Sequence, residues 1–364
     1  SPQSLVAGSA FPILPAGIAA NRGGDLAALW SLSDGRRSVL MASARSPGGE
    51  WAPEQALSRV GSSAWGRVVV APDGVATVIG RGLAGPGLWA VRREPGGRWE
   101  PARRISTPGV GVDAPAVAIG VDGRLGVVAL AKRPGVVRSL FSVQSSAEGE
   151  WGRPVPLAGS EGARGPAAAF AADGTLVAGW SREGDERVSI ESATRPPTGS
   201  WSRPRVEDSV PRGSAGPVLF AGAESPKLVW TRWNGAPGDR RAQVRAVDPA
   251  VPGPADIVAA PVLPPVDATS GLGPSAVIYG PPPLQVVGAG GEQAVVAWGQ
   301  PAAAGSSISA TTFSGRTWAN LVRLAVGPQS AFPIAAGGGS GHDAVVWTAG
   351  PPLSAADRLF VAAR

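Results

Sequence analysis

The fold is decided by three short stretches of sequence: APDGVATVIG (71–80), GVDGRLGVVAL (120–130) and AADGTLVAGW (171–180). Each holds an Asp-Gly pair followed by an apolar run, and the steps from Asp73 to Asp122 and on to Asp173 are 49 and 51 residues. Asp-Gly between apolar runs signals a β-hairpin, because a type I′ turn needs positive φ at both central residues. Weaker copies lie at 19–30, 221–230, 288–298 and 337–347. The chain is therefore a repeat of a hairpin unit about fifty residues long.

A second marker, a Gly-rich turn followed by tryptophan and a polar strand, recurs in five of these units. It is clearest in RSPGGEWAPEQAL (45–57) and REPGGRWEPARRI (93–105). The tryptophans of this outer turn are Trp51, Trp99, Trp151, Trp201 and Trp318. Each unit reads as four strands, of which the first two are apolar on both faces and the last two are more polar. This pattern favours many short strands over helices, since Gly and Pro interrupt almost every stretch of the chain.

Strands that are apolar on both faces suit sheets stacked face to face around an axis, which is the architecture of a β-propeller. We predict one all-β domain, a seven-bladed propeller of four-stranded antiparallel blades, with six blades as the competing count. The expected blades span 11–60, 61–110, 111–162, 163–212, 213–266, 284–329 and 330–364 plus 1–10. Because SPQSLVAGSA (1–10) resembles the fourth-strand segment RPVPLAGSEG (153–162), we expect the N-terminal strand to complete the last blade and close the ring.

One segment, residues 248–283, breaks the repeat with ten prolines. Proline has no amide to donate to a strand ladder, so most of this segment is expected to be loop or edge, an excursion between blades five and six. A long loop on a rigid scaffold is a place for function, and a plain spacer is the alternative.

The composition excludes several classes of function. The 364 residues include no cysteine, which rules out disulfides, thiolate metal sites and cysteine nucleophiles. The net charge of +6 comes from arginines spread along the chain, without the basic stripe and stacking aromatics of a nucleic-acid surface. No apolar run reaches 18 residues, so we predict no membrane insertion. The oligomeric state is not predicted.

The outer turn SPGGEW (46–51) resembles the Asp-box, Ser-x-Asp-x-Gly-x-x-Trp, of sialidase-like propellers. It keeps the Ser, Gly and Trp but is shorter and lacks the Asp. The two markers together also resemble tectonin-type propeller lectins and the repetitive secreted propellers of GC-rich actinobacteria. The resemblance covers nearly the whole chain, and it implies a propeller that is secreted or displayed at the cell surface.

No catalytic constellation emerges from the sequence. A sialidase would need converging arginines and a Tyr-Glu pair, but the first blade reads FPILP (11–15) where active sialidases show Arg-Ile-Pro. The only tyrosine is Tyr279, in the Pro-rich segment, and the only histidine is His342, at a predicted turn. No pair of carboxylates, metal-ligand cluster or phosphate-binding glycine motif is apparent. We therefore predict no enzyme activity, no metal and no cofactor, with a glycoside hydrolase as the enzymatic alternative.

Thirteen tryptophans against one tyrosine favour a binding module. Indole rings stack on the C–H faces of sugars, and repeated sites would act together. The candidates for ligand binding are Trp51, Trp99, Trp151, Trp201, Trp318, Trp65, Trp89 and Trp233. For the periodic ones, the alternative is a wedge packed between blades. We predict a non-catalytic extracellular module whose partner is a glycan, or in the alternative an extracellular protein for which the chain is an assembly scaffold.

Overall fold

The computed structural model describes residues 13–21, 23–33, 38–58, 65–132, 135–211, 218–220, 226–234, 241–250, 256–259, 285–288, 294–302, 305–313, 322–327, 330–339, 342–350 and 358–363. These residues form strands, turns and bends, and no helix occurs among them. Within this described part, no helix long and apolar enough to span a membrane is found. The all-β class predicted from the sequence is confirmed.

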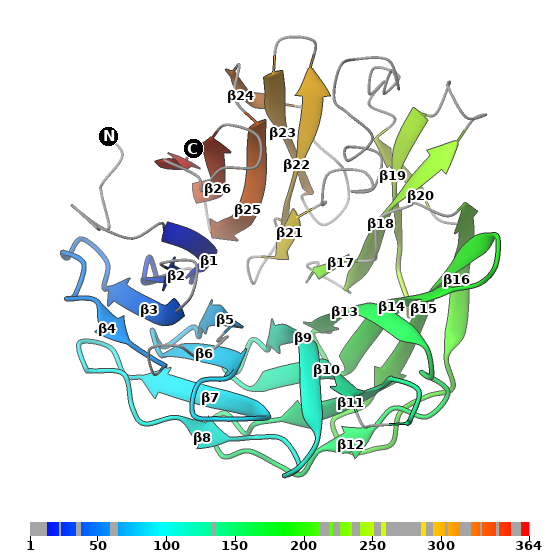
Figure 1. Cartoon of the computed structure of the whole chain (residues 1–364), viewed down its shortest axis with the longest axis horizontal. Coiled ribbons are helices and arrows are strands. Elements are labelled where there is room, and N and C mark those ends of the chain that lie inside the picture. The colour runs from blue at the N-terminus through cyan, green and yellow to red at the C-terminus, as the bar shows by residue number, and fades with distance from the viewer. Residues whose placement is uncertain are drawn as a thin grey trace.

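The described strands form seven antiparallel sheets arranged around a common centre, with the first strand of each sheet innermost (Figure 1). The innermost strands are β1 (Ile13–Ala20), β5 (Trp65–Val70), β9 (Gly111–Ile119), β13 (Ala163–Phe170), β17 (Val218–Phe220), β21 (Gln285–Gly288) and β25 (Ser330–Gly339). The second strands are β2 (Leu26–Ser33), β6 (Ala76–Arg81), β10 (Leu125–Lys132), β14 (Leu176–Glu183), β18 (Lys227–Asn234), β22 (Ala294–Ala302) and β26 (His342–Gly350). We number the sheets 1 to 7 in this order.

The third strands are β3 (Ser38–Arg45), β7 (Leu88–Arg93), β11 (Ser139–Gln144), β15 (Arg187–Arg195), β19 (Arg241–Val247), β23 (Gly305–Phe313) and β27 (Arg358–Ala363). The outermost strands are β4 (Gln55–Ala56), β8 (Arg103–Arg104), β12 (Val155–Pro156), β16 (Arg205–Pro211), β20 (Asp256–Ala259) and β24 (Val322–Gly327). Sheets 1 to 6 therefore have four strands each and sheet 7 has three. The predicted closing segment, residues 1–10, lies outside the described residues.

Each inner strand contacts the inner strand of the next sheet, and β25 also contacts β1. Of the Pro-rich segment 248–283, the described part includes one short edge strand, β20. The remainder of that segment, apart from residues 248–250 at its start, lies outside the description.

The core consists of apolar layers between neighbouring sheets. One layer joins Leu29 and Leu40 of sheet 1 to Val78 of sheet 2, and a second joins Ile79 of sheet 2 to Val127 of sheet 3. Because sheets 2, 3 and 4 are covered on both faces, the strands in them that are apolar on both faces are buried as expected. Burial of this apolar surface is the main force that holds the sheets together.

The Asp-Gly turns lie where the sequence places them, at the tips of the inner hairpins. Gly74, Gly123 and Gly174 have φ of 85°, 84° and 82°, a backbone region that glycine enters without steric cost. The aspartate preceding Gly74 accepts a hydrogen bond from the amide of Val75 (Asp73 Oδ1, 3.1 Å), which holds the turn. The repeat of these turns fixes the length of each inner hairpin.

The third strands are more buried than their polar sequences suggest. The side chains of Ser142 and Ser192 are almost fully buried, and so is that of Glu191. The expected gradient toward a polar rim begins only at the fourth strands. The reason is that the outer turns of sheets 2, 3 and 4 each place a tryptophan over the preceding sheet, so the third strands remain inside the stack.

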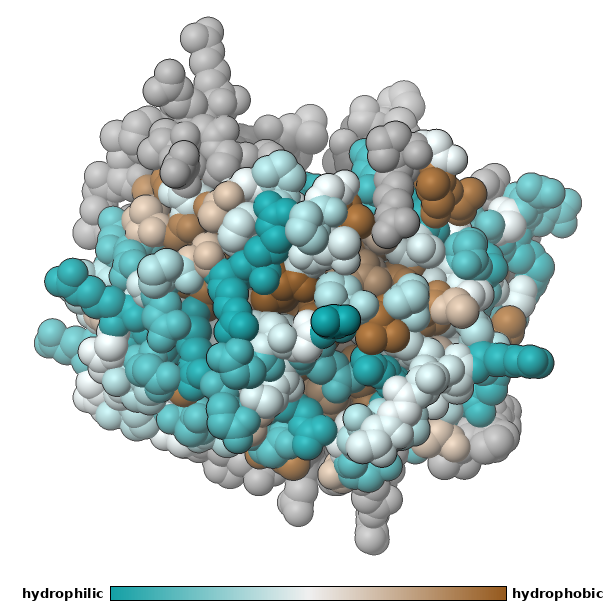
Figure 2. All heavy atoms as spheres, turned by 90° about the horizontal axis from the view of Figure 1, so that it is seen from below, coloured by the Kyte–Doolittle hydropathy of each residue, from teal (hydrophilic) through white to brown (hydrophobic). Residues whose placement is uncertain are grey.

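Polar side chains cover most of the rim of the ring that Figure 2 views, with apolar side chains in small separate areas between them. Ion pairs such as Arg103–Glu150 lie on this kind of exposed surface. The rim therefore has the composition of an ordinary solvent-exposed protein surface.

A candidate ligand-binding groove between sheets 2 and 3

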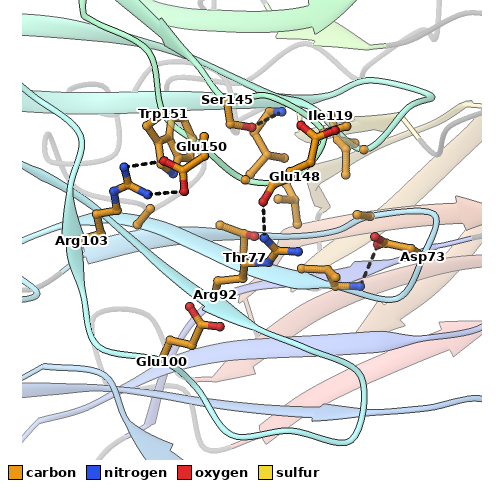
Figure 3. A pocket seen from close by; sticks show the side chains of 18 of the residues that line it. Asp73, Thr77, Arg92, Glu100, Arg103, Ile119, Ser145, Glu148, Glu150 and Trp151 are labelled. Carbon is orange, nitrogen blue, oxygen red and sulfur yellow. Dashed lines mark hydrogen bonds and ion pairs between the residues drawn. The ribbon is translucent and has the colours of Figure 1, made fainter.

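A hollow of about 140 Å³ lies between sheets 2 and 3 (Figure 3). It runs from the inner hairpins to the outer turn of sheet 3, residues 145–151. Its side walls come from β7 and from the segment before β8. The inner hairpin tips and the outer turns lie at the same end of each sheet, so this edge of the ring gathers the two turns that define the repeat. We call this hollow the groove.

The inner end of the groove is apolar. Val69 of β5, Ile119 of β9 and Leu125 of β10 line it, next to the hairpin residue Asp73. Val69 and Ile119 face each other because inner strands of neighbouring sheets present opposite faces to the same gap. An apolar end and a polar opening give the groove two chemically different halves.

The outer wall of the groove is Trp151. Its side chain is half-buried, and its apolar part packs against the layer that includes Ala90 and Ile105. A single backbone bridge pairs Trp151 with Ser145, which closes the outer turn, and the amide of Leu125 donates to the Ser145 hydroxyl (2.9 Å). The indole therefore serves as a wedge between sheets and keeps part of its surface toward the groove.

Two arginines of sheet 2 hold the outer turn of sheet 3. Arg103 forms a two-pronged ion pair with Glu150, with nitrogen–oxygen distances of 2.8 and 3.2 Å. Arg92 donates to the backbone carbonyl of Glu148 (2.7 Å) and also pairs with Glu94 at 2.9 Å. These exposed pairs contribute little to stability, and their effect here is to fix the position of the turn over the groove.

The carboxylates at the opening are held in the charged form. The hydrogen bond from Arg103 and then its charge lower the pKa of Glu150, and the pKa of Arg103 is raised by the same contacts. The hydroxyl of Ser146 lowers the pKa of Glu148. Glu100, on the sheet 2 side, lines the same opening. The groove therefore presents carboxylate acceptors and guanidinium donors beside one aromatic wall.

The size of the groove limits what it can hold. Sites that enclose a drug-sized ligand measure roughly 300–1,000 Å³. A hollow of about 140 Å³ is large enough for one small ring or side group, with the rest of the ligand in solvent. Within the described residues, no cluster of His, Asp or Glu could hold a metal ion.

Two other outer-turn tryptophans, Trp99 and Trp201, pack between neighbouring sheets. Trp99 is only 6% exposed and lies in the layer between sheets 1 and 2, so it has almost no surface for a ligand. Trp51 is half-buried and stacks with Arg45 at 5.5 Å. Trp201 is half-buried and donates from its indole nitrogen to the Ser142 hydroxyl of sheet 3 (3.1 Å). The alternative of a wedge between blades therefore describes the packing of Trp99 and Trp201. Trp151 packs between sheets in the same way and also lines the groove.

The tryptophans that break the repeat occupy different places. Trp65 is the first residue of β5, and the Arg67 guanidinium lies over its ring at 5.4 Å. Trp89 donates to the Gly85 carbonyl (2.9 Å) and carries Arg104 over its ring at 4.8 Å. Trp233 belongs to β18, and its side chain is outside the described part, as is all of Trp318.

Sequence reasoning missed the charged residues of the groove. The motif that signals them is the run REPGGRWEPARRI (93–105) with Arg92 before it, whose arginines alternate with acids. That run shows where the charged residues lie but not their partners. Arg103 pairs with Glu150, which is 47 residues away in the next repeat.

Comparison with known proteins identifies the fold of this chain but no family for it. No family model and no curated protein matches the chain. Among solved structures, the polysaccharide lyase Uly1 matches with a TM-score of 0.58 at 11% identity, covering 98% of this chain and 90% of the lyase. The β-propeller domain of the Trilobed protease from Pyrococcus furiosus matches at 0.56 and 10%, covering 96% and 95%. The Hadza microbial sialidase Hz136 matches at 0.51 and 12%, covering 87% and 74%. The chain therefore has the β-propeller fold.

Proposed function

We propose that this propeller is a non-catalytic binding module that recognises carbohydrate, and that one sugar unit binds in the groove. The observation that carries the proposal is the half-buried indole of Trp151 next to hydrogen-bonding groups from two different sheets. Such a combination, one flat apolar wall with a few fixed polar groups, is how small polar ligands are oriented in protein sites.

The chemistry of the lining matches a sugar ring. The electron-rich face of an indole attracts the weakly positive C–H groups of a pyranose face. Sugar hydroxyls donate to carboxylates and accept from guanidinium groups, and hydrogen bonds with one charged partner are stronger than neutral ones. Glu100, Glu148 and Arg92 supply such groups around Trp151. The similar solved propellers include a sialidase and a polysaccharide lyase by name, which supports looking for a glycan first.

The test is a glycan array probed with the full chain, followed by calorimetry with any glycan that binds. We expect Trp151→Ala to weaken binding by about tenfold or more, the loss of roughly 1.4 kcal/mol of stacking. Glu148→Gln is expected to weaken it to a smaller degree. The matched control is Trp201→Ala, because Trp201 has the same place in its repeat and similar burial but does not line the groove.

Two results would reject a carbohydrate site in the groove. One is an array without binding, and in that case a co-purifying protein would favour the assembly scaffold. The other is equal weakening by Trp151→Ala and Trp201→Ala, which would assign the loss to general destabilisation. Thermal unfolding of both variants separates that case.

The absence of catalysis is part of the proposal and has its own test. We propose that the groove carboxylates bind and do not transfer protons, since Glu150 is tied to Arg103 on both oxygens. A panel of fluorogenic glycosides, sialosides included, should show no turnover above a blank. Turnover that is lost in Glu100→Gln or Glu148→Gln would overturn this and make the groove an active site.

We also propose a ring of seven blades closed by residues 1–10. Support comes from sheet 7, which has three strands where the others have four, and from the contact of β25 with β1. The Trilobed protease propeller, by contrast, has an open velcro topology. Deletion of residues 1–10 should lower the thermal midpoint if they form the fourth strand and leave it unchanged if the ring is open. The extracellular location stays a prediction, which cell fractionation tests.

A further inference from the structure

A second feature of the molecule lies at the inner edge of sheet 2 and is independent of the groove function proposed above. β5 presents alternate residues to its two neighbours: Gly66 and Val68 are buried and turn toward sheet 1, where Val68 lies 3.8 Å from the position of a Cβ on Gly17. The other face, which carries Arg67 and Val69, turns toward sheet 3. Arg67 therefore lies where inner strands of neighbouring sheets approach.

This position holds a small residue in the other sheets whose side chains are described here. The register of the inner hairpins makes Gly17, Ala116 and Ala167 the equivalents of Arg67. Small residues at this point allow close approach of the inner strands. Arginine is too long to be enclosed there, and Arg67 is exposed. The strand that carries it, β5, lies at the inner edge of the ring (Figure 1).

The surroundings of the Arg67 guanidinium are unusual for an exposed arginine. It stacks over Trp65, 5.4 Å from the ring centre, which fixes its plane. Burial lowers the pKa of Arg67, although water still reaches the side chain. Both facts hold for a group in a concave place, surrounded by protein on several sides and open on one.

No acid neutralises this charge within the described residues. Asp113 of β9, the strand next to β5, pairs at 3.2 Å with Arg81, the cross-strand neighbour of Trp65. Among the described residues, the Arg67 guanidinium makes no hydrogen bond or ion pair, so none of them occupies its five donors. A partly desolvated cation without a partner favours a bound anion, because the anion restores the interactions that burial removes.

We propose that Arg67, held on the ring of Trp65, binds an oxyanion group at the inner edge of the propeller. The guanidinium fork matches two oxygens of a carboxylate, sulfate or phosphate group, and stacking on an aromatic face leaves that fork free to point at the ligand. The site thus selects ligands that carry an acidic group. Chloride has no oxygen atoms to match the two prongs of the guanidinium and binds poorly.

The experiment titrates the full chain with acetate, sulfate and phosphate at constant ionic strength set by chloride, followed by calorimetry and by tryptophan fluorescence. We expect saturable binding of at least one oxyanion, weakened about tenfold or more in Arg67→Gln. Arg67→Lys keeps the charge without the fork and should retain only part of the affinity. Trp65→Phe should remove most of the fluorescence change while binding persists in calorimetry.

The matched control is Arg203→Gln, since Arg203 is also exposed and its guanidinium has no hydrogen bond among the described contacts. Saturation by acetate alone identifies a carboxylate group as the ligand, and saturation by sulfate or phosphate identifies a tetrahedral one; either supports the site. Absence of saturable binding to all three, or equal weakening by Arg67→Gln and Arg203→Gln, overturns it. Neither result bears on Trp151, so the two proposals fail separately.

Discussion

The buried contact between Trp180 and Glu191 offers the sharpest test of how neighbouring strands are joined. Trp180 is fully buried in sheet 4, and its indole nitrogen donates to Glu191 Oε2 at 2.9 Å. Arg182 donates to the same oxygen at 2.7 Å, and Ser189 donates to Oε1 at 2.7 Å. The carboxylate is thus the common acceptor for three donors at a place that water barely reaches.

Sheet 1 contains a natural variant of this contact. Its cross-strand pair at the same register is Trp30 with Met41, where sheet 4 pairs Trp180 with Glu191. The methionine thioether is only a weak acceptor, and the indole nitrogen of Trp30 is buried without a hydrogen-bond partner among the described residues. The fold therefore tolerates the loss, which makes Glu191→Met a change that preserves side-chain length and removes only the acceptor.

The expected cost follows from the donors left behind. Glu191→Met leaves the buried Trp180 N–H without its acceptor, at about 1–3 kcal/mol. The half-buried Ser189 hydroxyl loses its shorter bond at a smaller cost, because the Arg182 carbonyl remains as an acceptor at 3.4 Å. Arg182 is 35% exposed and turns to water, so its share is small. We expect a loss of about 2–4 kcal/mol in the free energy of unfolding. With an unfolding entropy of roughly 2.1 cal/mol/K per residue, 364 residues give about 0.8 kcal/mol/K, and the thermal midpoint falls by about 3–5 °C.

A double-mutant cycle isolates the bond itself. Trp180→Phe removes the donor, and in the double variant neither donor nor acceptor is left unpaired. The coupling energy between Trp180 and Glu191 should be about 1.5–3 kcal/mol, the range for a hydrogen bond to a charged group. Differential scanning calorimetry of the four proteins measures it. A coupling below about 0.5 kcal/mol, which is the limit for independent sites, refutes the reasoning.

Three further outcomes are expected. Gly149→Ala should lower the free energy of unfolding by about 1–3 kcal/mol, because its φ is 88° and the new Cβ meets the Arg92 guanidinium. Gly96→Ala, with φ 71° and open space around the new Cβ, should lose only the part due to backbone strain. Thermal unfolding of the two variants compares them. Gln55→Ala removes two hydrogen bonds to the backbone of the next outer turn and should lower the free energy of unfolding by about 1–3 kcal/mol, measured by chemical denaturation. Because the pKa values of Glu148 and Glu150 are lowered, both stay charged as the pH falls, so calorimetry should find ligand affinity constant from about pH 8 to 5 and declining only below about pH 4.

The strands and turns could be predicted because they are local. Asp73 and Gly74 specify a hairpin by their own backbone preferences, and the apolar runs beside them are long enough for one strand each. Four-stranded antiparallel sheets follow from counting such runs. The count of sheets in a closed ring is a different matter, since it depends on how the first and last strands meet.

The groove could not be predicted because it depends on distances between repeats. Arg103 and Glu150 meet only when sheets 2 and 3 stack at a particular offset, and nothing in either segment names the other. The same holds for Asp208, at the outer edge of sheet 4, which accepts from Trp230 and Arg232 of sheet 5. A Trp-x-Arg pattern is visible in the sequence, but its carboxylate partner lies on the same sheet in one case and on the preceding sheet in the other.

A repeated fold directs attention to the positions where the repeat is broken. A residue that recurs in most units can be explained by packing that those units share, as Trp99 shows at the buried outer turn of sheet 2. A residue that departs from its equivalents has no such explanation. Arg67 stands where Gly17, Ala116 and Ala167 allow close packing. The Arg67 charge is partly desolvated, and the oxyanion that we propose as its ligand would restore the interactions lost on burial.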